Sequence, residues 1–197
     1  MVNADPNIFA LNRGRGTGGY ALSFRERPVI NFAVAAAKIK PVPITLGVYY
    51  GFDMPVSNWS DDQYLFLTHS VPRRWDGVSN PIYSVACILG TANTDVKFQM
   101  RVGWRHYTPD GDVLPATSTN VDVETVVSGA KAQYFSYKVD FTIDYDILTP
   151  DNMTAGDVLA LKIGRIAKTA GGTEATGNII IFGGVIQYNR DKIGSSQ

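Results

Sequence analysis

The sequence has one cysteine, two histidines and, among its 18 acidic residues, only three glutamates. A single cysteine cannot form an intramolecular disulfide, so the fold does not depend on an oxidising compartment. Two histidines with one cysteine cannot complete an ordinary zinc site without carboxylates. Glutamate favours helices, whereas the plentiful aspartate, asparagine and glycine favour turns. The composition therefore predicts an all-β protein and gives no sign of a metal or cofactor.

The chain also lacks a charge excess and a long apolar run. Basic and acidic residues number 18 each, which gives a formal net charge of +0. A protein that coats nucleic acid non-specifically carries a basic excess, so nucleic acid is not the expected partner. No window approaches the ~20 apolar residues of a membrane span, and residues 1–6 do not begin a signal peptide. We expect a soluble protein, made in a cytoplasm, whose balanced charge is compatible with self-association.

Strand-like runs separated by turn residues follow one another through most of the chain. Apolar and polar residues alternate most clearly from Val96 to Trp104, as in a strand with one buried face. Short strands with turns at about ten-residue spacing predict one antiparallel β-sandwich domain, jelly-roll-like, over residues 20–197. The expected strands are Tyr20–Phe24, Val29–Val34, Ile44–Tyr50, Gln63–Thr68, Ile82–Leu89, Val96–Tyr107, Asn120–Val127, Tyr134–Asp144, Asp157–Ile166 and Asn178–Tyr188.

Residues 1–19 are predicted to form an extended N-terminal arm. Ile8–Leu11 is a short apolar anchor, and Asn12–Gly19 is too rich in glycine to hold a regular element. The formal G-x-G-x-x-G pattern at Gly14–Gly19 precedes a strand-like run instead of a helix, which argues against a dinucleotide site. Such an arm either docks on a neighbouring molecule or frays.

The last two expected strands are joined by the polar, glycine-bearing segment Lys168–Gly177. Apolar, β-branched runs bounded by such a segment indicate an antiparallel hairpin. The near-continuous apolar run Ile179–Phe182 indicates a strand that is covered on both faces or lies at an interface.

Single residues that could carry chemistry lack the context for it. Cys87 lies in the apolar run Tyr83–Leu89, where a buried, unreactive thiol is expected. His69 and His106 each lie at a strand end, and no nucleophile motif accompanies them, so surface or partner contacts are their expected role. We therefore expect no enzyme activity.

Aromatic residues in loops are the clearest candidates for binding. Trp59 and Trp75 stand in polar loops, and Tyr49 is followed directly by Tyr50. Tyrosine and tryptophan are enriched at binding hot spots and can stack on sugar rings. Large aromatic side chains equally fill the core of a sandwich, and the sequence leaves both roles open.

Features of the second half of the chain carry a family resemblance. Gly156–Ala167 contains the pattern G-D-x-L…R, and the apolar strand Ile179–Tyr188 is followed by Asp191–Ser195 in a Y-x-x-D-x-x-G-S tail. Together with Trp104 on its long strand, they resemble the ends of small β-rich structural proteins of tailed bacteriophages and prophages. The resemblance implies a virion component, either a capsid decoration or cement protein or a tail or head-fibre subunit, and one that is often oligomeric.

The sequence and the resemblance together predict an accessory capsid protein, because 197 residues is short for the usual major shell fold of tailed phages. The expected partners are copies of itself, with a trimer favoured, and other virion proteins. The alternative is a carbohydrate-binding β-sandwich that uses loop aromatics, with a glycan as partner. The residues expected at partner contacts are Ile8, Phe9, Leu11, Arg13 and Arg15 in the arm, Trp59 and Trp75 in loops, and Ile180 and Phe182 in the last strand.

Overall fold

The computed structural model describes residues 24–26, 42–56, 64–109, 111, 117–147 and 152–190. The expected arm, residues 1–19, and the expected strand Val29–Val34 lie outside these residues. No helix is present in the part of the chain that is described. The strands are β1 (Phe24–Glu26), β2 (Val42–Leu46), β3 (Tyr49–Met54), β4 (Leu65–Ser70), β5 (Ile82–Leu89), β6 (Asn93–Tyr107), β7 (Thr119–Lys131), β8 (Ser136–Thr142), β9 (Val158–Ile166) and β10 (Ile179–Tyr188).

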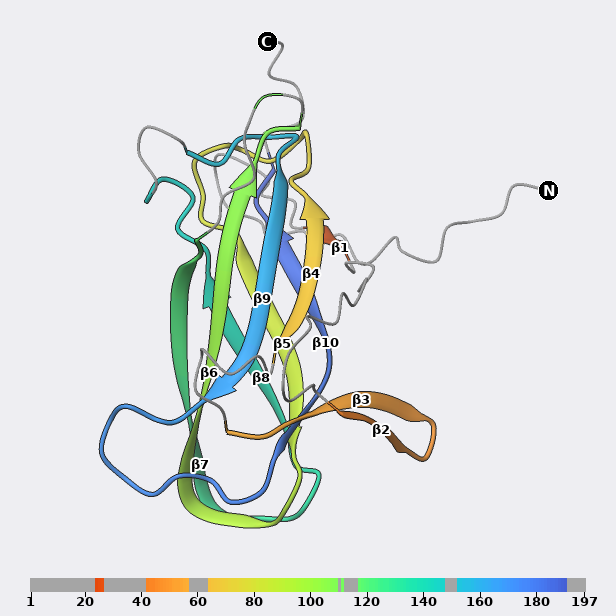
Figure 1. Ribbon diagram of the computed structural model, residues 1–197, viewed down its shortest axis with the longest axis vertical. Helices are drawn as coiled ribbons and strands as arrows, with labels where there is room; N and C mark the ends of the chain where they lie inside the picture. The colour runs from red at the N-terminus through yellow and green to blue at the C-terminus, as the bar shows by residue number, and fades with distance from the viewer. Residues whose placement is uncertain are drawn as a thin grey trace, which may run out of the picture.

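The strands form two facing antiparallel sheets (Figure 1). Sheet A has the order β2-β3-β10-β5-β8, with β1 also paired to β10, and sheet B has the order β4-β9-β6-β7. Strands β3-β10-β5-β8 facing β4-β9-β6-β7 are the eight strands of a jelly roll, in which the chain crosses repeatedly between the sheets. The predicted all-β, jelly-roll-like sandwich is confirmed.

The core lies between the sheets and follows the alternation expected for β6. Phe98, Met100, Val102 and Trp104 are all 0% exposed, and they face Val85, Val139, Phe141 and other inward residues of sheet A in one cluster. The polar residues between them lie on the outer side of sheet B, as a period of two requires.

The predicted hairpin between the last two strands is wrong. Strand β9 pairs with β4 and β6 in sheet B, while β10 pairs with β3 and β5 in sheet A. The connection between them instead crosses the end of the sandwich and bonds to β6: Lys97 N donates to Thr173 O at 2.9 Å and Ala175 N donates to Lys97 O at 2.7 Å. Apolar content indicates that a strand is buried, but it does not identify the strand's neighbours.

The expected single strand Ile44–Tyr50 is a hairpin. Leu46 pairs with Tyr49, so β2 turns into β3 through two residues, Gly47 and Val48. Gly47 has a φ of 61°, a conformation that glycine adopts readily and that two-residue hairpin turns require. The sequence analysis treated Gly47 as part of a strand and therefore missed the turn.

Candidate interaction surface

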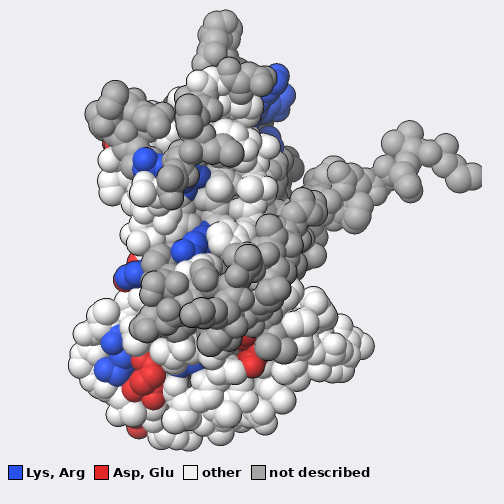
Figure 2. Space-filling model, in the orientation of Figure 1, with Lys and Arg blue, Asp and Glu red and all other residues white. Residues whose placement is uncertain are grey.

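The β2–β3 hairpin projects sideways from the lower part of the sandwich in Figure 1. Asp53 is the only charged residue in Val42–Met54, and the tip of the hairpin shows neither blue nor red in Figure 2. Val48 is 94% exposed, Tyr49 66% and Tyr50 56%. An uncharged, projecting hairpin with large exposed side chains is an unusual surface for an isolated molecule, because exposed apolar patches commonly mark interaction sites.

A groove on the outer side of sheet A lies against this hairpin. Its volume is about 720 Å³, and it is lined by Leu46, Gly47, Tyr49, Ile88, Tyr134, Ser136 and Phe182. These residues come from the β2–β3 hairpin, β5, the start of β8 with the turn before it, and β10. Sequence reasoning identified Phe182 as a contact residue but not Leu46, Ile88 or Tyr134. We call this feature the apolar groove.

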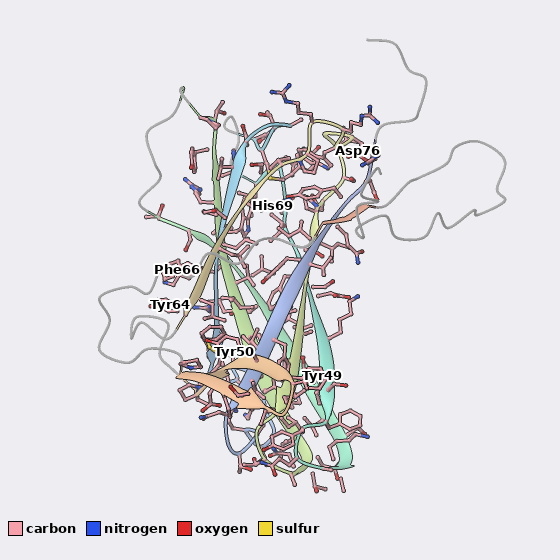
Figure 3. The ribbon with its side chains drawn as sticks, turned by 90° about the vertical axis from the view of Figure 1, so that its right-hand side faces the viewer. Tyr49, Tyr50, Tyr64, Phe66, His69 and Asp76 are labelled. Atoms are coloured by element: carbon pink, nitrogen blue, oxygen red, sulfur yellow. The ribbon has the colours of Figure 1, made fainter. Side chains whose placement is uncertain are left out.

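Strand alternation determines which side of the hairpin faces the apolar groove. Leu46 and Tyr49 are paired across the two strands and share the outer side, whereas the next residue, Tyr50, shares its side with Phe52 and lies 5.5 Å from it between ring centroids. The Tyr49 ring meets the Phe182 ring edge to face at 6.0 Å. Figure 3 shows both tyrosines at the hairpin, far from His69 in β4.

A glycine lets the hairpin approach β10 closely. A Cβ at Gly51 would lie 2.9 Å from Ile180 Cγ2, 2.9 Å from Ile181 O and 3.1 Å from Phe182 Cδ1. Because the outer face at Gly51 carries no side chain, Ile180 is buried against it at 2% exposure. The side chain of Ile180, one of the predicted partner contacts, is therefore already covered within the molecule.

Tyr134 borders the apolar groove from the turn before β8. It has a φ of 68°, which is costly for a bulky side chain. Two backbone hydrogen bonds hold the turn, from Tyr134 N to Leu89 O at 2.8 Å and from Leu89 N to Phe135 O at 3.1 Å. Tyr134 is 47% exposed, so the turn adds one accessible aromatic ring to the groove, whereas the Phe135 ring contacts Tyr137 and Lys131 instead.

The outer side of sheet B has a different character. Lys97 Nζ lies 2.6 Å from Glu124 Oε1, and Arg101 bonds both oxygens of Asp122, at 2.6 and 2.7 Å. These cross-strand ion pairs between β6 and β7 make a hydrated, charged face. The two outer faces of the sandwich are therefore unlike each other, and only sheet A combines an apolar groove with a projecting hairpin among the described residues.

Trp75, for which the sequence left a binding role and a core role open, lies in the core. Its side chain is 2% exposed, its Nε1 donates to Ser79 O at 3.0 Å, and its ring meets Tyr145 and Tyr188 at 5.5 and 6.4 Å. The turn at Pro72 directs it inward, through a hydrogen bond from Trp75 N to Pro72 O at 3.0 Å. The other predicted contact residues, Ile8, Phe9, Leu11, Arg13, Arg15 and Trp59, lie outside the described residues.

His106 is also buried, contrary to the expected surface role. It is 1% exposed, and its Nδ1 lies 3.1 Å from Asp157 Oδ2. Asp157 accepts further hydrogen bonds from Thr108 Oγ1 at 2.9 Å, Thr154 N at 2.7 Å and Thr154 Oγ1 at 3.0 Å. The carboxylate and the imidazole are thus enclosed by hydrogen bonds within the fold. His69 is half-buried and stacks on the Tyr188 ring at 5.7 Å.

The expected burial of Cys87 is confirmed. Its thiol is buried at 1% exposure, and burial raises its pKa to about 12. Within the described ranges, no three side chains of His, Cys, Asp or Glu come together as metal ligands. The same ranges contain no helix long and apolar enough to cross a membrane.

Comparisons with known proteins do not name a family. No protein-family model and no curated protein matches the chain. The chain is similar to CBM28, a carbohydrate-binding module specific for non-crystalline cellulose, at 10% identity over 83% of this chain and 86% of the module, with a TM-score of 0.36. It is similar to VP1 of Trichodysplasia spinulosa-associated polyomavirus at 10% identity over 94% of this chain and 100% of VP1, with a TM-score of 0.19. With TM-scores this low, neither similarity carries an argument about function.

Proposed function

We propose that the protein is an accessory structural subunit of a virion, a capsid decoration or cement protein, which associates with copies of itself and with the virion lattice through sheet A. The proposal includes no catalytic step. It combines the phage-protein resemblance of the second half of the chain with the surface that the fold builds at the β2–β3 hairpin.

The observation that carries the proposal is the apolar groove beside the projecting hairpin. A stable interface removes about 800 Å² per partner from solvent, and its central part is apolar and aromatic. Tyr49, Tyr134 and Phe182 supply such a centre, and the exposed Val48 at the hairpin turn extends it. The ion pairs Lys97–Glu124 and Arg101–Asp122 leave sheet B without a comparable apolar centre.

The topology is consistent with this proposal. Eight-stranded jelly rolls are used by viral capsid and lectin domains, although a fold alone does not establish a function. The formal net charge of +0 also means that copies do not repel one another strongly. These two facts support the proposal without carrying it.

Light scattering on the full-length chain tests the proposal. We expect a native mass that is a multiple of the 21.5 kDa chain mass, with a trimer favoured, and we expect Tyr49→Asp to lower it. The matched control is Val126→Asp, which places the same charge at a 56% exposed position of sheet B and should leave the mass unchanged. A monomer at micromolar concentration, or equal effects of the two substitutions, would contradict association through sheet A.

A glycan-binding function is the second candidate, and the exposed Tyr49 and Tyr134 favour it because sugar rings stack on such side chains. The buried Trp75 can no longer serve as a stacking platform. A glycan array compares the two candidates: binding that is lost in Tyr134→Ala, in a chain that is monomeric, would favour the glycan function.

A further inference from the structure

We propose that the apolar groove receives the segment Ile8–Leu11 from the N-terminal arm of a neighbouring copy. This inference rests on the proposed self-association and names its contact: one copy supplies an apolar segment and the next supplies the groove. It makes the proposed function more specific. The groove alone identifies an apolar surface that favours contact with a partner, but it does not say which segment of the partner binds there.

The chemistry of the groove fits an apolar peptide better than a sugar. A sugar site needs several fixed polar groups to bind hydroxyls, whereas the polar side-chain groups among the seven lining residues are the Ser136 hydroxyl and the phenols of Tyr49 and Tyr134. Leu46, Ile88 and Phe182 offer only hydrocarbon. A volume of about 720 Å³ lies within the range of ligand-sized sites and accommodates a few large side chains.

The sequence provides one suitable terminal segment. Two terminal stretches lie outside the described residues, 1–23 and 191–197. The C-terminal stretch, Asp191–Gln197, has Ile193 as its single large apolar residue. The N-terminal stretch has Ile8-Phe9-Ala10-Leu11 in succession, which provides a phenylalanine and two branched aliphatic side chains for the groove.

The direction of β1 favours a neighbouring copy over the same copy. β1 runs antiparallel to β10, with Phe24 opposite Tyr188 and Glu26 opposite Ile186. Phe24 therefore lies at the Tyr188 end of β10, six residues or roughly 20 Å from Phe182, and β1 runs from there toward the groove. The twelve residues between Leu11 and Phe24 span at most ~40 Å. To reach the groove of their own copy, these residues would have to run opposite to the direction of β1. The groove of a neighbouring copy can be reached without that reversal.

Mixing two full-length variants tests the inference directly. The arm variant Phe9→Asp keeps an intact groove, and the groove variant Tyr49→Asp keeps an intact arm. We expect each variant alone to lose native mass, and an equimolar mixture to regain an assembly of at least two chains, because the intact arm of one variant fits the intact groove of the other. A contact within one copy would give no recovery on mixing.

A peptide of residues 5–15 provides a second readout. Fluorescence anisotropy should show the peptide binding to the Phe9→Asp chain, and the affinity should fall about tenfold or more when Tyr49→Asp is added, as for an aromatic hot spot. The same peptide with Phe9→Asp is the control and should not bind. Val126→Asp should leave peptide binding unchanged.

The outcomes separate this inference from the proposed function. If the wild-type chain is an oligomer that Tyr49→Asp dissociates but Phe9→Asp does not, self-association stands and the arm is not the occupant. If every form is a monomer and the peptide does not bind, both proposals are overturned. If the peptide does not bind and a glycan binds in a Tyr49-dependent way, the groove is a sugar site and the inference is wrong.

Discussion

The Arg165 guanidinium lies 2.8 Å from the Glu174 carboxylate, across the connection that carries the chain from sheet B to sheet A. Arg165 is 0% exposed, and it also donates to the carbonyl oxygens of Ala175, at 2.7 Å, and Gly177. Burial lowers the pKa of the guanidinium, and the hydrogen bond to Glu174 acts in the opposite direction. One buried cation thus holds three residues of this crossing, Glu174, Ala175 and Gly177.

Replacing Arg165 with methionine should destabilise the fold strongly. Arg165→Met leaves the Ala175 and Gly177 carbonyls without their donor, and we expect a loss of about 3 kcal/mol in the free energy of unfolding. Arg101→Met is the matched control: its bidentate pair with Asp122 lies on the surface, so about 1 kcal/mol or less is expected. Urea unfolding measures both, and equal losses would show that the buried contacts have no special weight.

The contact between the hairpin and β10 should tolerate no side chain at Gly51. In Gly51→Ala the new Cβ meets Ile180 and the Ile181 carbonyl at 2.9 Å, so we expect a loss of about 1–3 kcal/mol from overpacking and a weaker native assembly. Gly183→Ala, whose Cβ would have no atom within 4 Å, should change stability by about 0.5 kcal/mol or less. Thermal and urea unfolding of the pair check this, and an unaffected Gly51→Ala would mean that the hairpin is not seated against β10.

Cys87 should be unreactive in the native protein. Because its thiol is buried with a pKa near 12, the thiolate that attacks alkylating reagents is scarce at pH 8. Mass spectrometry after iodoacetamide treatment should show no modification in buffer and complete modification in denaturant. Cys87→Ala with Val126→Cys gives the rate of an open thiol for comparison. Rapid native alkylation at Cys87 would show that β5 opens.

Acid should remove the contribution that Asp140 makes to the stability of the folded protein. Partial burial raises the pKa of Asp140, but hydrogen bonds from Lys138 Nζ at 2.8 Å and Ser84 Oγ at 2.5 Å outweigh it, so the net pKa is lowered. A carboxyl whose pKa is lowered by folding stabilises the protein above its unfolded pKa and loses this effect as pH falls through its folded pKa.

The stability difference between wild type and Asp140→Asn should therefore be largest near pH 7 and shrink in acid. Urea midpoints at several pH values measure it. Thr142→Ala, an exposed outer position of the same strand, should give a difference that does not vary with pH. A gap that widens in acid would contradict the assigned sign.

The sequence predicted which face of a strand is buried better than it predicted which strands pair with each other. Alternation along Val96–Trp104 was sufficient to identify the buried side of β6, because a strand between core and solvent leaves a period-two pattern. The position of β9 and β10 in different sheets depends on which strands lie beside them, and the buried Arg165–Glu174 contact that closes the crossing joins residues from two segments. Nothing within either segment signals that pairing.

The burial of single residues was hard to predict from the sequence for a related reason. Trp75 follows Arg73 and Arg74 in a polar loop, and His106 stands at a strand end, so the sequence left a binding role open for Trp75 and predicted a surface or partner-contact role for His106. Long-range contacts with Tyr188 and Asp157 bury them instead. The apolar groove is similar, since its lining comes from separate segments. One signal was present in the sequence: the stretch Val42–Phe52 contains no charged residue.

The ion pairs across β6 and β7 have a consequence for the outside of an assembly. A copy that is seated through sheet A turns the Lys97–Glu124 and Arg101–Asp122 rungs away from the contact. The outer surface of a particle covered by such copies would consist of hydrated pairs of opposite charges. Neither positive nor negative charge would dominate this surface. Long-range attraction and repulsion between particles would then both be weak, and their spacing in suspension would change little with salt.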